Sequence, residues 1–554
     1  MVRRVALVGA ELEENLSLRY LAASVAEDGF RPELIPFNAA ADVERVVARI
    51  AALDPLVVGI SVPFQTRARE LVGLVGLLRA RGVRAHVTLG GHFATFEYAN
   101  LLRDFPAVDS VVRHEGELTL SDICRRVRDE EPVAGIPGTV TRGAAGLVDG
   151  GRRPLPPLDD LPFPDRRGTP REILGIASGP LVGSRGCYAD CSFCCIHAYH
   201  RNADGPRYRT RSPENIVAEM REEYERRGVR LFVFHDDNFL VPSLRRNLER
   251  CRRLKKLLQE AGLDEIALVI KCRPTDVHTE LFALLRSMGL IRAYVGIETN
   301  SDEGIVSLNR RVTPEDNRRA LTVLRDLGIY CSFNVLMFDP EATLDGVRAN
   351  LGFMQRFADV PFNFCRAEVY AGTPLKRILE EQGRLRGDYW AWGYEMRDPR
   401  VEVLFRIVTT AFAGRNCRSD GIANLTLGIR FDNEVMRRFY PDAWDPVWHE
   451  TLIDLTRRVG LDSVRGLERS LAFVSAEDVR DGDTVKRFTM ALCREVARAD
   501  LEFVTECKAF RGEIVRRIRS VADWPVLSRD TAPALASSVG MGVSTEILPV
   551  PIQI

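Results

Sequence analysis

Apolar positions follow two rhythms over residues 2–140 of this 554-residue chain. Short apolar runs typical of buried strands lie at residues 5–8, 32–36, 56–61, 85–89 and 110–113. Apolar positions spaced three or four residues apart predict helices at residues 15–28, 43–53 and 68–81. Strands that alternate with helices predict a doubly wound parallel sheet, with a ligand site at the carboxyl ends of its strands.

A proline-rich stretch at residues 152–167 excludes regular helix and strand. Apolar runs then resume at residues 176–182, 231–234, 267–270, 293–297, 330–337 and 363–370. Ser212 offers a cap and Pro213 a first position for a helix that extends to Arg227. Polar residues follow several of the runs, as they do at the sites of β/α barrels, so this part predicts a partial barrel.

Beyond Arg384 only helical periodicities remain, at residues 451–459, 464–473, 483–504 and 513–521. The sequence therefore predicts an α/β chain in four parts. A Rossmann-like domain covers residues 1–150, a linker 151–174, a partial (β/α)6 barrel 175–388, and a helical domain 389–554 that caps the barrel mouth and selects the substrate. Four tryptophans gather in two places of this last part, Trp390, Trp392, Trp444 and Trp448, and residues 527–554 form either a tail or a lid.

Charge and composition limit the classes of partner and the cellular location that we expect for the chain. Lys plus Arg and Asp plus Glu both total 77, so nothing electrostatic favours a nucleic-acid partner. No apolar run approaches the roughly 18 residues of a membrane span, and the N-terminal run is too short for a signal peptide. The 12 cysteines are scattered apart from one cluster, which is unlike a disulfide framework, so we expect a reducing, cytoplasmic location.

Cys187, Cys191 and Cys194 form that cluster, in a C-x3-C-x2-C spacing just after a predicted strand. Thiolates suit iron–sulfur clusters, and three of them leave one iron of a four-iron cluster open. A zinc knuckle is the alternative. It normally requires a second cysteine pair or histidines, and only His197 and His200 lie near. Cys195 is outside the spacing and is interpreted as a packed thiol or an active-site neighbour.

The spacing, with Ser184-Arg185-Gly186 before it and Phe193 inside it, resembles the radical S-adenosylmethionine (SAM) superfamily. The resemblance implies a [4Fe–4S] cluster on the three cysteines and SAM chelated to its open iron. It also implies cleavage of SAM to a 5′-deoxyadenosyl radical. The positions that match SAM contacts are Phe193, Asp236, Asp237, Arg273, Glu298, Ser332 and Asn334. In that match the aspartates hold the methionine ammonium, Arg273 the carboxylate, and Ser332 and Asn334 the ribose. The stretch around Phe338 departs from the family, which usually has glycine there.

The N-terminal pattern resembles the cobalamin-binding domain that precedes the radical domain in one subfamily. The matching positions and the candidate corrin contacts are Glu14, Asn15, Leu16, Ser61, Gln65, Thr66, Arg67, Arg69, Gly90, Gly91, His92, Glu115, Gly116 and Glu117. The D-x-H-x-x-G motif, whose histidine ligates cobalt from below, is absent around His86, His92 and His114. Radical methylases of this class often lack it. A cobalamin-like domain that has lost its ligand is the alternative.

The resemblance as a whole implies a cobalamin-dependent radical SAM methylase. It would transfer a methyl group from methylcobalamin to a carbon of a small-molecule or peptide precursor in secondary metabolism. Corrin, substrate and cluster would share one cavity, and an external flavodoxin- or ferredoxin-type protein would supply electrons. No acid–base catalytic residue stands out.

Three alternatives remain. The same cofactors serve non-methylating rearrangement, oxidation or cyclisation, including tetrapyrrole ring closure. A variant resembling the tryptophan methylases would transfer the methyl group without the adenosyl radical. A non-catalytic corrinoid sensor is opposed by the intact cysteine triad. A methylthiotransferase is disfavoured because Cys124 is the one cysteine upstream of the cluster.

Overall fold

The structure is a computed structural model in which residues 3–522 are described. The chain divides into two compact units. The first unit contains Met1–Thr169, Val182–Asn215 and Val369–Tyr394. The second contains Pro170–Leu181, Ile216–Glu368 and Glu395–Ile554. The region of residues 527–554, predicted to be a tail or a lid, lies outside the described residues.

The sheet of the first unit has the strand order β2-β1-β3-β4-β5-β6-β7. Its strands are β1 (Arg4–Gly9), β2 (Arg31–Pro36), β3 (Val57–Ser61), β4 (His86–Gly90), β5 (Ser110–Val112), β6 (Thr139–Gly143) and β7 (Gly146–Asp149). The first five strands pair in parallel, and β6 and β7 add an antiparallel hairpin. The strand order reverses between β1 and β3, where such sheets open a crevice for a ligand.

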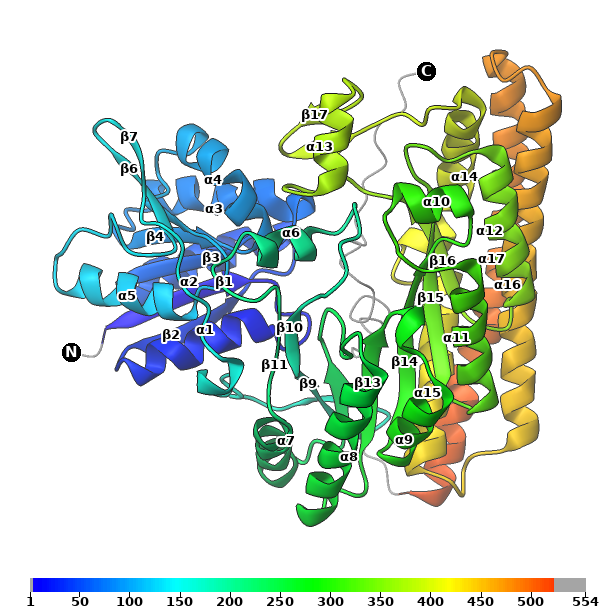
Figure 1. The fold of residues 1–554 in the computed structure, drawn as a ribbon, viewed down its shortest axis with the longest axis horizontal. Helices are drawn as coiled ribbons and strands as arrows, with labels where there is room; N and C mark the ends of the chain where they lie inside the picture. Colours follow the sequence, from blue (N-terminus) through cyan, green and yellow to red (C-terminus); the bar gives the residue numbers. More distant parts are fainter. Residues whose placement is uncertain (1–2, 523–554) are drawn as a thin grey trace. The chain divides into compact units, whose positions relative to one another are not determined.

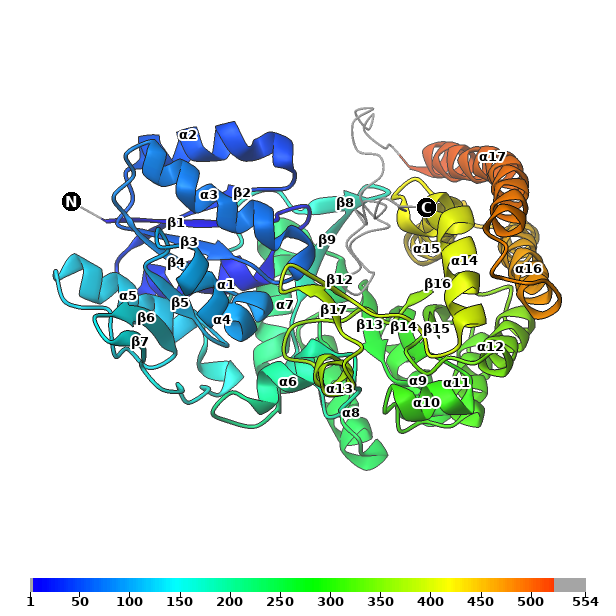
Figure 2. The ribbon, with the colours of Figure 1, turned by 90° about the horizontal axis from the view of Figure 1, so that it is seen from above.

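Helices cover both faces of this sheet: α1 (Leu16–Glu27), α2 (Val43–Leu53), α3 (Ala68–Ala80), α4 (His92–Asp104) and α5 (Glu117–Arg128). The helix α1 packs on α5, and α2 packs on α3 across the opposite face (Figure 2). Leu18 of α1 and Ile123 of α5 join Val5 and Leu7 of β1 in one buried cluster. The predicted doubly wound sheet is confirmed.

The second unit contains the predicted partial barrel. Its strands β9 (Ile176–Leu181), β12 (Leu231–Phe234), β13 (Ala267–Cys272), β14 (Leu290–Glu298), β15 (Tyr330–Phe338) and β16 (Phe362–Arg366) are parallel. An antiparallel strand β8 (Arg171–Ile173) extends the edge at β9. The intervening helices are α7 (Pro213–Arg227), α8 (Leu244–Glu260), α9 (Thr279–Ser287), α10 (Asp302–Ser307), α11 (Pro314–Asp326) and α12 (Leu344–Arg356).

Four helices follow the barrel, where a helical domain was predicted: α14 (Pro399–Cys417), α15 (Ile422–Phe439), α16 (Pro446–Ala476) and α17 (Gly482–Val521). Figure 1 shows α16 and α17 as long, continuous helices. The prediction of two shorter helices in place of each was wrong. Gly460 does not interrupt α16. A Cβ there would lie 2.6 Å from the Ala358 carbonyl oxygen, so glycine permits close packing.

The helix α15 packs against the amino ends of the barrel strands. Phe431, Val435 and Met436 share a buried cluster with Leu231, Ala267, Ile291 and Tyr330, which begin or nearly begin β12 to β15. The helix α14 lies along the edge strand β16, where Phe412 contacts Phe364. The role of these helices in substrate selection stays a prediction. No helix among the described residues is long and apolar enough to span a bilayer.

A buried guanidinium joins three of the C-terminal helices. Arg415 of α14 is 1% exposed and donates to Asp462 and Ser463 of α16, each at 2.7 Å, and to Asp500 of α17 at 2.8 Å. Two carboxylates therefore neutralise one buried cation. Removal of the cation takes from Asp500 its ion pair with Arg415 and leaves Asp462 with the exposed Arg465 at 3.1 Å.

We expect Arg415→Met to lower the free energy of unfolding by about 3 kcal/mol, because breaking a buried ion pair costs more than the pair contributes. Urea unfolding of the full chain, followed by circular dichroism, measures the change. Arg418→Met is the matched control, because Arg418 pairs with Asp420 at the surface and should cost less than about 1 kcal/mol. Equal losses in the two variants would contradict this account of α14.

Candidate active site

The three clustered cysteines belong to the first unit. A short antiparallel stem, β10 (Ser184–Gly186) with β11 (Tyr208–Thr210), carries the loop at residues 187–194, called the cluster loop, and the helix α6 (Cys195–Arg201). Gly186 has a φ of +86°, and a Cβ at this position would overlap the carbonyl of Arg207. Glycine is therefore required where the stem turns into Cys187.

The cluster loop holds its thiols close enough to interact electrostatically. The Ala189 N–H donates to Cys187 Sγ at 3.4 Å, and the Cys194 N–H donates to the Cys191 carbonyl at 3.2 Å. Burial raises the pKa of the Cys194 thiol well above its usual value, and the neighbouring Cys195, Cys191 and Cys187 raise it further. Three thiolates in such a place need positive charge from bound metal.

In residues 3–522, no group of three or more histidine, cysteine, aspartate or glutamate side chains is arranged around one metal ion. A four-iron cluster makes a different demand, because each thiolate binds a different iron. Cys195 is buried and lines a cavity of about 10 Å³, room for one water, with Gln65, His92 and Tyr370. Its role stays open.

Four charged side chains, called here the anchor network, fix the stem to the turn between β5 and α5. Arg185 of β10 pairs with Glu115 and with Glu117, each at 2.7 Å, and Arg209 of β11 pairs with Glu115. Burial raises the pKa of Glu115. At Glu117 burial also acts to raise the pKa, but the charge and hydrogen bond of Arg185, a backbone hydrogen bond and the charge of Arg209 together lower it. Glu115 and Glu117, predicted as corrin contacts, are thus engaged with guanidiniums.

Tyr199 of α6 is the centre of a second contact with the sheet. Its ring centroid lies 4.2 Å from that of His92, 5.1 Å from that of His114 and 5.1 Å from that of His200. Burial is the main cause that lowers the pKa of His92 and His114 to about 4 and that of His200 to about 3. All three imidazoles are therefore neutral near pH 7.

The segment from the last residue of β3 to the first turn of α3 contains five of the predicted corrin contacts, Ser61, Gln65, Thr66, Arg67 and Arg69. Thr66 and Arg69 line a cavity of about 580 Å³ with Gln65 and Trp390, and the Arg69 guanidinium lies 5.2 Å from the Trp390 ring. Gln65 is buried, and its amide donates to the Val369 carbonyl at 2.9 Å. Its Oε1 has no hydrogen-bond partner within residues 3–522. Arg67 instead donates to Glu70 and to the Phe37 carbonyl.

Residues from 369 to 394 complete this side of the unit with α13 (Pro374–Glu381), β17 (Arg386–Asp388) and β18 (Ala391–Gly393). The Leu375 N–H donates to the Ser192 carbonyl of the cluster loop at 2.8 Å. Trp390 and Trp392 are therefore part of the first unit, where Trp390 lines the cavity and Trp392 lies 4.7 Å from Lys376 Nζ.

The other predicted corrin contacts lie at the carboxyl ends of β1, β4 and β5. Asn15 caps α1, which begins at Leu16, and Glu14 pairs with Arg166 at 2.6 Å. Gly90 ends β4, and Gly91, with a φ of +100°, precedes His92. A Cβ on Gly91 would lie 2.8 Å from the Val62 carbonyl oxygen. Gly116 precedes α5. The strand ends are thus assembled as predicted, but the ligand contacts stay predictions.

The second unit brings buried charges to the ends of three barrel strands. Asp236 follows β12 and is 1% exposed, whereas Asp237 beside it is exposed. Arg273 follows β13 and is 7% exposed. Asn238 donates to Asp276 Oδ2 at 3.1 Å, and the Arg273 N–H donates to the same oxygen at 3.2 Å. A carboxylate and a guanidinium in such places suit the ammonium and carboxylate of an amino acid.

Glu298 ends β14 in an unusual backbone conformation. Its φ is +64°, and the pairing of β14 with β15 shifts register between Val295 and Glu298. Such an irregularity re-aims a strand-end side chain. Burial raises the pKa of Glu298, while Arg310 and Arg273 oppose the rise. Arg310 is buried and donates to the Gly296 carbonyl.

The three remaining SAM candidates differ in position. Phe193 is half-buried in the cluster loop of the first unit. Asn334 is half-buried at the middle of β15. Ser332 is fully buried near the amino end of β15, where its hydroxyl accepts a hydrogen bond from Arg292 at 3.0 Å. It therefore does not lie at the carboxyl end, where barrel sites form.

Sequence reasoning missed Arg185, Arg209 and Arg310. The two anchor arginines stand in ordinary polar strand positions, and nothing local marks their carboxylate partners about 70 and 94 residues away. Arg310 lies between Asn309 and Arg311, both with positive φ. Asn309-Arg310-Arg311 carries no turn signal that distinguishes its buried member.

Two family models match the chain. The one described as the radical SAM superfamily covers residues 181–347, and the one described as a B12 binding domain covers residues 4–124. This chain is a radical SAM enzyme with a B12-binding domain. Its cofactors are a [4Fe–4S] cluster, SAM and cobalamin.

The similar proteins include two kinds of enzyme, a methyltransferase and a cyclase. An uncharacterized methyltransferase of Pyrococcus horikoshii is 25% identical over 65% of this chain and 77% of its own length. An anaerobic magnesium-protoporphyrin IX monomethyl ester cyclase of Rubrivivax gelatinosus is 27% identical over 58% of this chain and 59% of its own length. The enzyme thus spans less than two thirds of the cyclase.

The solved structure of the cobalamin-dependent SAM radical enzyme OxsB with aqua-cobalamin bound is similar throughout. It covers 94% of this chain and 81% of its own length with a TM-score of 0.67 and 15% identity. At that identity the likeness shows the fold.

The residues present fit these cofactors. The thiols of the cluster loop supply three soft ligands on one short segment, as a four-iron cluster requires. The unpartnered Gln65 Oε1 lies beside the 580 Å³ cavity at the strand ends, where a polar ligand group would satisfy it.

We expect Cys187→Ala, Cys191→Ala and Cys194→Ala each to lose most of the bound iron and sulfide, because each removes one of three cluster ligands. Cys195→Ala is the matched control and should keep both. Iron and sulfide content per chain after anaerobic reconstitution measures the effect. Retention of a full cluster in any of the first three variants would contradict the ligand assignment.

We expect His200 to make the enzyme less stable in mild acid. Its pKa is about 3 when folded and roughly 6.5 when unfolded, so below pH 6.5 the unfolded state takes up a proton that the folded state does not. The stability is complete above pH 6.5 and declines as pH falls toward 3. At pH 5.5 the loss is about 1.4 kcal/mol.

His200→Gln should reduce the difference in unfolding free energy between pH 7.5 and pH 5.5 by that amount. Urea unfolding at the two pH values measures it, and the pH-independent cost of the substitution cancels in the difference. An unchanged difference would show that His200 is not a neutral buried group.

Proposed function

We propose that this enzyme is a cobalamin-dependent radical SAM methyltransferase. It would transfer the methyl group to a carbon of a small-molecule or peptide precursor in secondary metabolism. One observation carries the proposal: the cluster loop is built into the same compact unit as the B12-binding sheet. A reaction that uses only the cluster, or only the corrinoid, has no need of this arrangement.

Three sets of contacts within the first unit support this reading. The anchor network fixes the stem to the β5–α5 turn. The ring of Tyr199 packs on His92 and His114 at the ends of β4 and β5. The hydrogen bond from Leu375 to Ser192 adds the 369–394 segment. The loop position is therefore set by the same strand ends that are predicted to meet the corrin.

Cobalamin would supply a methyl carrier that takes its methyl group from one SAM molecule, and a second SAM, bound at the cluster, would supply the radical for hydrogen abstraction. The chain's residues bind and orient these groups. Cys187, Cys191 and Cys194 hold the cluster. Asp236, Arg273 and Glu298 are the residues we assign to the methionine moiety, and the loop from Ser61 to Arg69 to the corrin. A protein electron donor in the cytoplasm completes the proposal.

A non-methylating cyclisation is the second candidate, because a cyclase relative is 27% identical over 58% of this chain. Both candidates use the same cofactors. They differ in whether cobalamin acquires a methyl group from SAM.

We expect the cobalamin-loaded, cluster-reconstituted enzyme to transfer a labelled methyl group from trideuteromethyl-SAM to cobalamin under anaerobic reducing conditions. It should also release 5′-deoxyadenosine and S-adenosylhomocysteine. Mass spectrometry of the three products measures this without a known substrate. The Cys191→Ala variant is the control and should form no 5′-deoxyadenosine.

The outcomes separate the candidates. Labelled methylcobalamin with both nucleoside products supports the methyltransferase. 5′-Deoxyadenosine without methylcobalamin favours the cyclisation. Methylcobalamin without 5′-deoxyadenosine, even when candidate substrates are added, favours a non-radical methyl transfer. A reconstituted protein that retains neither cluster nor corrinoid would overturn the proposal.

A further inference from the structure

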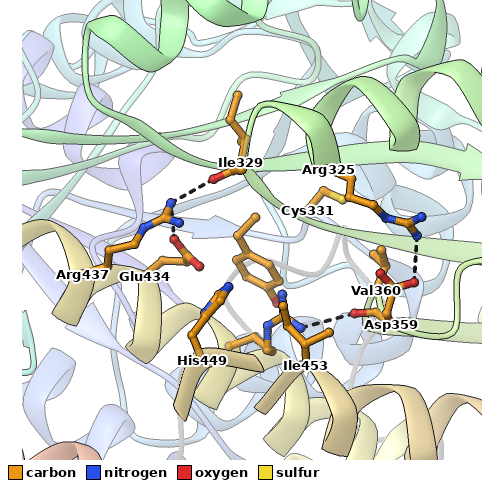
Figure 3. Close-up of a pocket in the computed structure, with 12 residues that line it drawn as sticks. Arg325, Ile329, Cys331, Asp359, Val360, Glu434, Arg437, His449 and Ile453 are labelled. Carbon is orange, nitrogen blue, oxygen red and sulfur yellow. Dashed lines mark hydrogen bonds and ion pairs between the residues drawn. The ribbon is translucent and has the colours of Figure 1, made fainter. Parts of the chain in front are cut away.

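A cavity of about 100 Å³ in the second unit lies away from the strand ends that carry the SAM candidates. Its lining comes from the turns that lead into β15 and β16 and from the helices α11, α15 and α16 (Figure 3). These turns precede the amino ends of parallel strands, whereas Glu298 and its neighbours follow the carboxyl ends. Nothing in the proposed reaction uses this cavity.

Three guanidiniums line the cavity, and two of them are neutralised. Arg325 pairs with Asp359 at 2.8 Å, and Arg437 pairs with Glu434 at 2.6 Å (Figure 3). Arg437 also donates to the Gly328 carbonyl at 2.8 Å. Because each of these two guanidiniums is paired with a carboxylate, the net positive charge of the lining comes from Arg430.

Arg430 of α15 is buried and forms no ion pair with a carboxylate among the described residues. Glu434 pairs with Arg437, and the charge of Arg430 is a weaker influence that lowers the pKa of Glu434. Arg430 is 8% exposed, and its Nη1 makes only long contacts, 3.3 Å to the Asp359 carbonyl and 3.4 Å to Thr456 Oγ1. Its Nε has no hydrogen-bond partner. The guanidinium carbon lies 5.5 Å from the Tyr330 ring, which compensates the charge only in part. Buried charges are otherwise paired.

His449 adds a further donor to the same lining (Figure 3). The Asn433 amide lies 2.7 Å from His449 Nδ1, so with the amide as donor the imidazole carries its proton on Nε2. Burial lowers the pKa of His449 to about 4, and the charges of Arg430 and Arg437 add to the shift. The imidazole is therefore neutral near pH 7 and can donate from Nε2, and both guanidiniums act against its protonation.

We propose that this cavity binds a small oxyanion, a phosphate or a carboxylate, with Arg430 as its principal ligand. A guanidinium presents a planar fork that matches two oxygens of such an anion. The volume is well below the roughly 300–1,000 Å³ of sites for larger organic ligands, so a nucleotide is excluded by size. The anion would bridge α15 and α16 to the turns before β15 and β16.

The test is thermal unfolding of the full-length holoenzyme in a buffer without oxyanions, with inorganic phosphate or acetate added at matched chloride ionic strength. Either anion should raise the unfolding temperature of the wild type, because it binds the folded state alone. In Arg430→Met the apparent Kd should weaken at least about tenfold. Arg430→Lys, which keeps the charge but not the fork, should bind with intermediate affinity.

A second expectation concerns the stability of Arg430→Met when no anion is present. Arg430→Met should then be as stable as the wild type or more stable, because it removes an uncompensated buried charge. Arg458→Met, which breaks a surface pair with Glu506 at 2.6 Å, is the matched control and should leave the anion response unchanged. A stronger response to phosphate assigns phosphate as the ligand class, and a stronger response to acetate assigns a carboxylate.

Two results would overturn the proposal. One is no response of the wild type to either anion. The other is an equal response in the wild type and Arg430→Met. A loss of stability in anion-free Arg430→Met would also count against it, since Arg430 would then have its counter-charge within the protein.

Discussion

The first unit depends on one set of buried ion pairs, those of Arg185 and Arg209 with Glu115 and Glu117. The side chains of Arg185 and Glu117 are 16% and 7% exposed, so their charges interact at low effective dielectric. Loss of one partner would leave an uncompensated buried charge, at a cost of about 3–5 kcal/mol. The stem of the cluster loop therefore cannot leave the β5–α5 turn without that cost.

This constraint explains why the cluster loop belongs to the B12-binding unit although the chain reaches it from β9, a barrel strand. The two large side chains of the loop itself, Tyr188 and Phe193, are only half-buried. Charges at Arg185, the ring of Tyr199 and the backbone of Ser192 supply the contacts. The loop position is thus imposed from outside the loop, which a motif alone does not reveal.

The strands and the cysteine motif were predictable because each is a local signal. The apolar runs that became β1, β3, β12 and β15 needed only their neighbours in sequence to be recognised. The anchor network was not predictable, because its partners are brought together by the sheet. Gly460 shows the same limit: glycine lowers helix propensity, but in α16 it permits a close approach to Ala358 within a continuous helix. Ser332 and Glu298 were chosen by the same pattern, yet only Glu298 lies at the carboxyl end of its strand.

Two buried arginines of the helical part show how charge balance distinguishes a structural ion pair from a candidate binding site. Arg415 meets Asp462 and Asp500 and is satisfied within the protein. Arg430, which is also buried, contacts a carbonyl, a hydroxyl and the face of Tyr330. Since burial disfavours an isolated charge in both places, only the second site has a reason to take up an anion. The same reasoning distinguishes the engaged Glu117, which Arg185 neutralises, from Gln65, whose buried oxygen has no partner beside a large cavity.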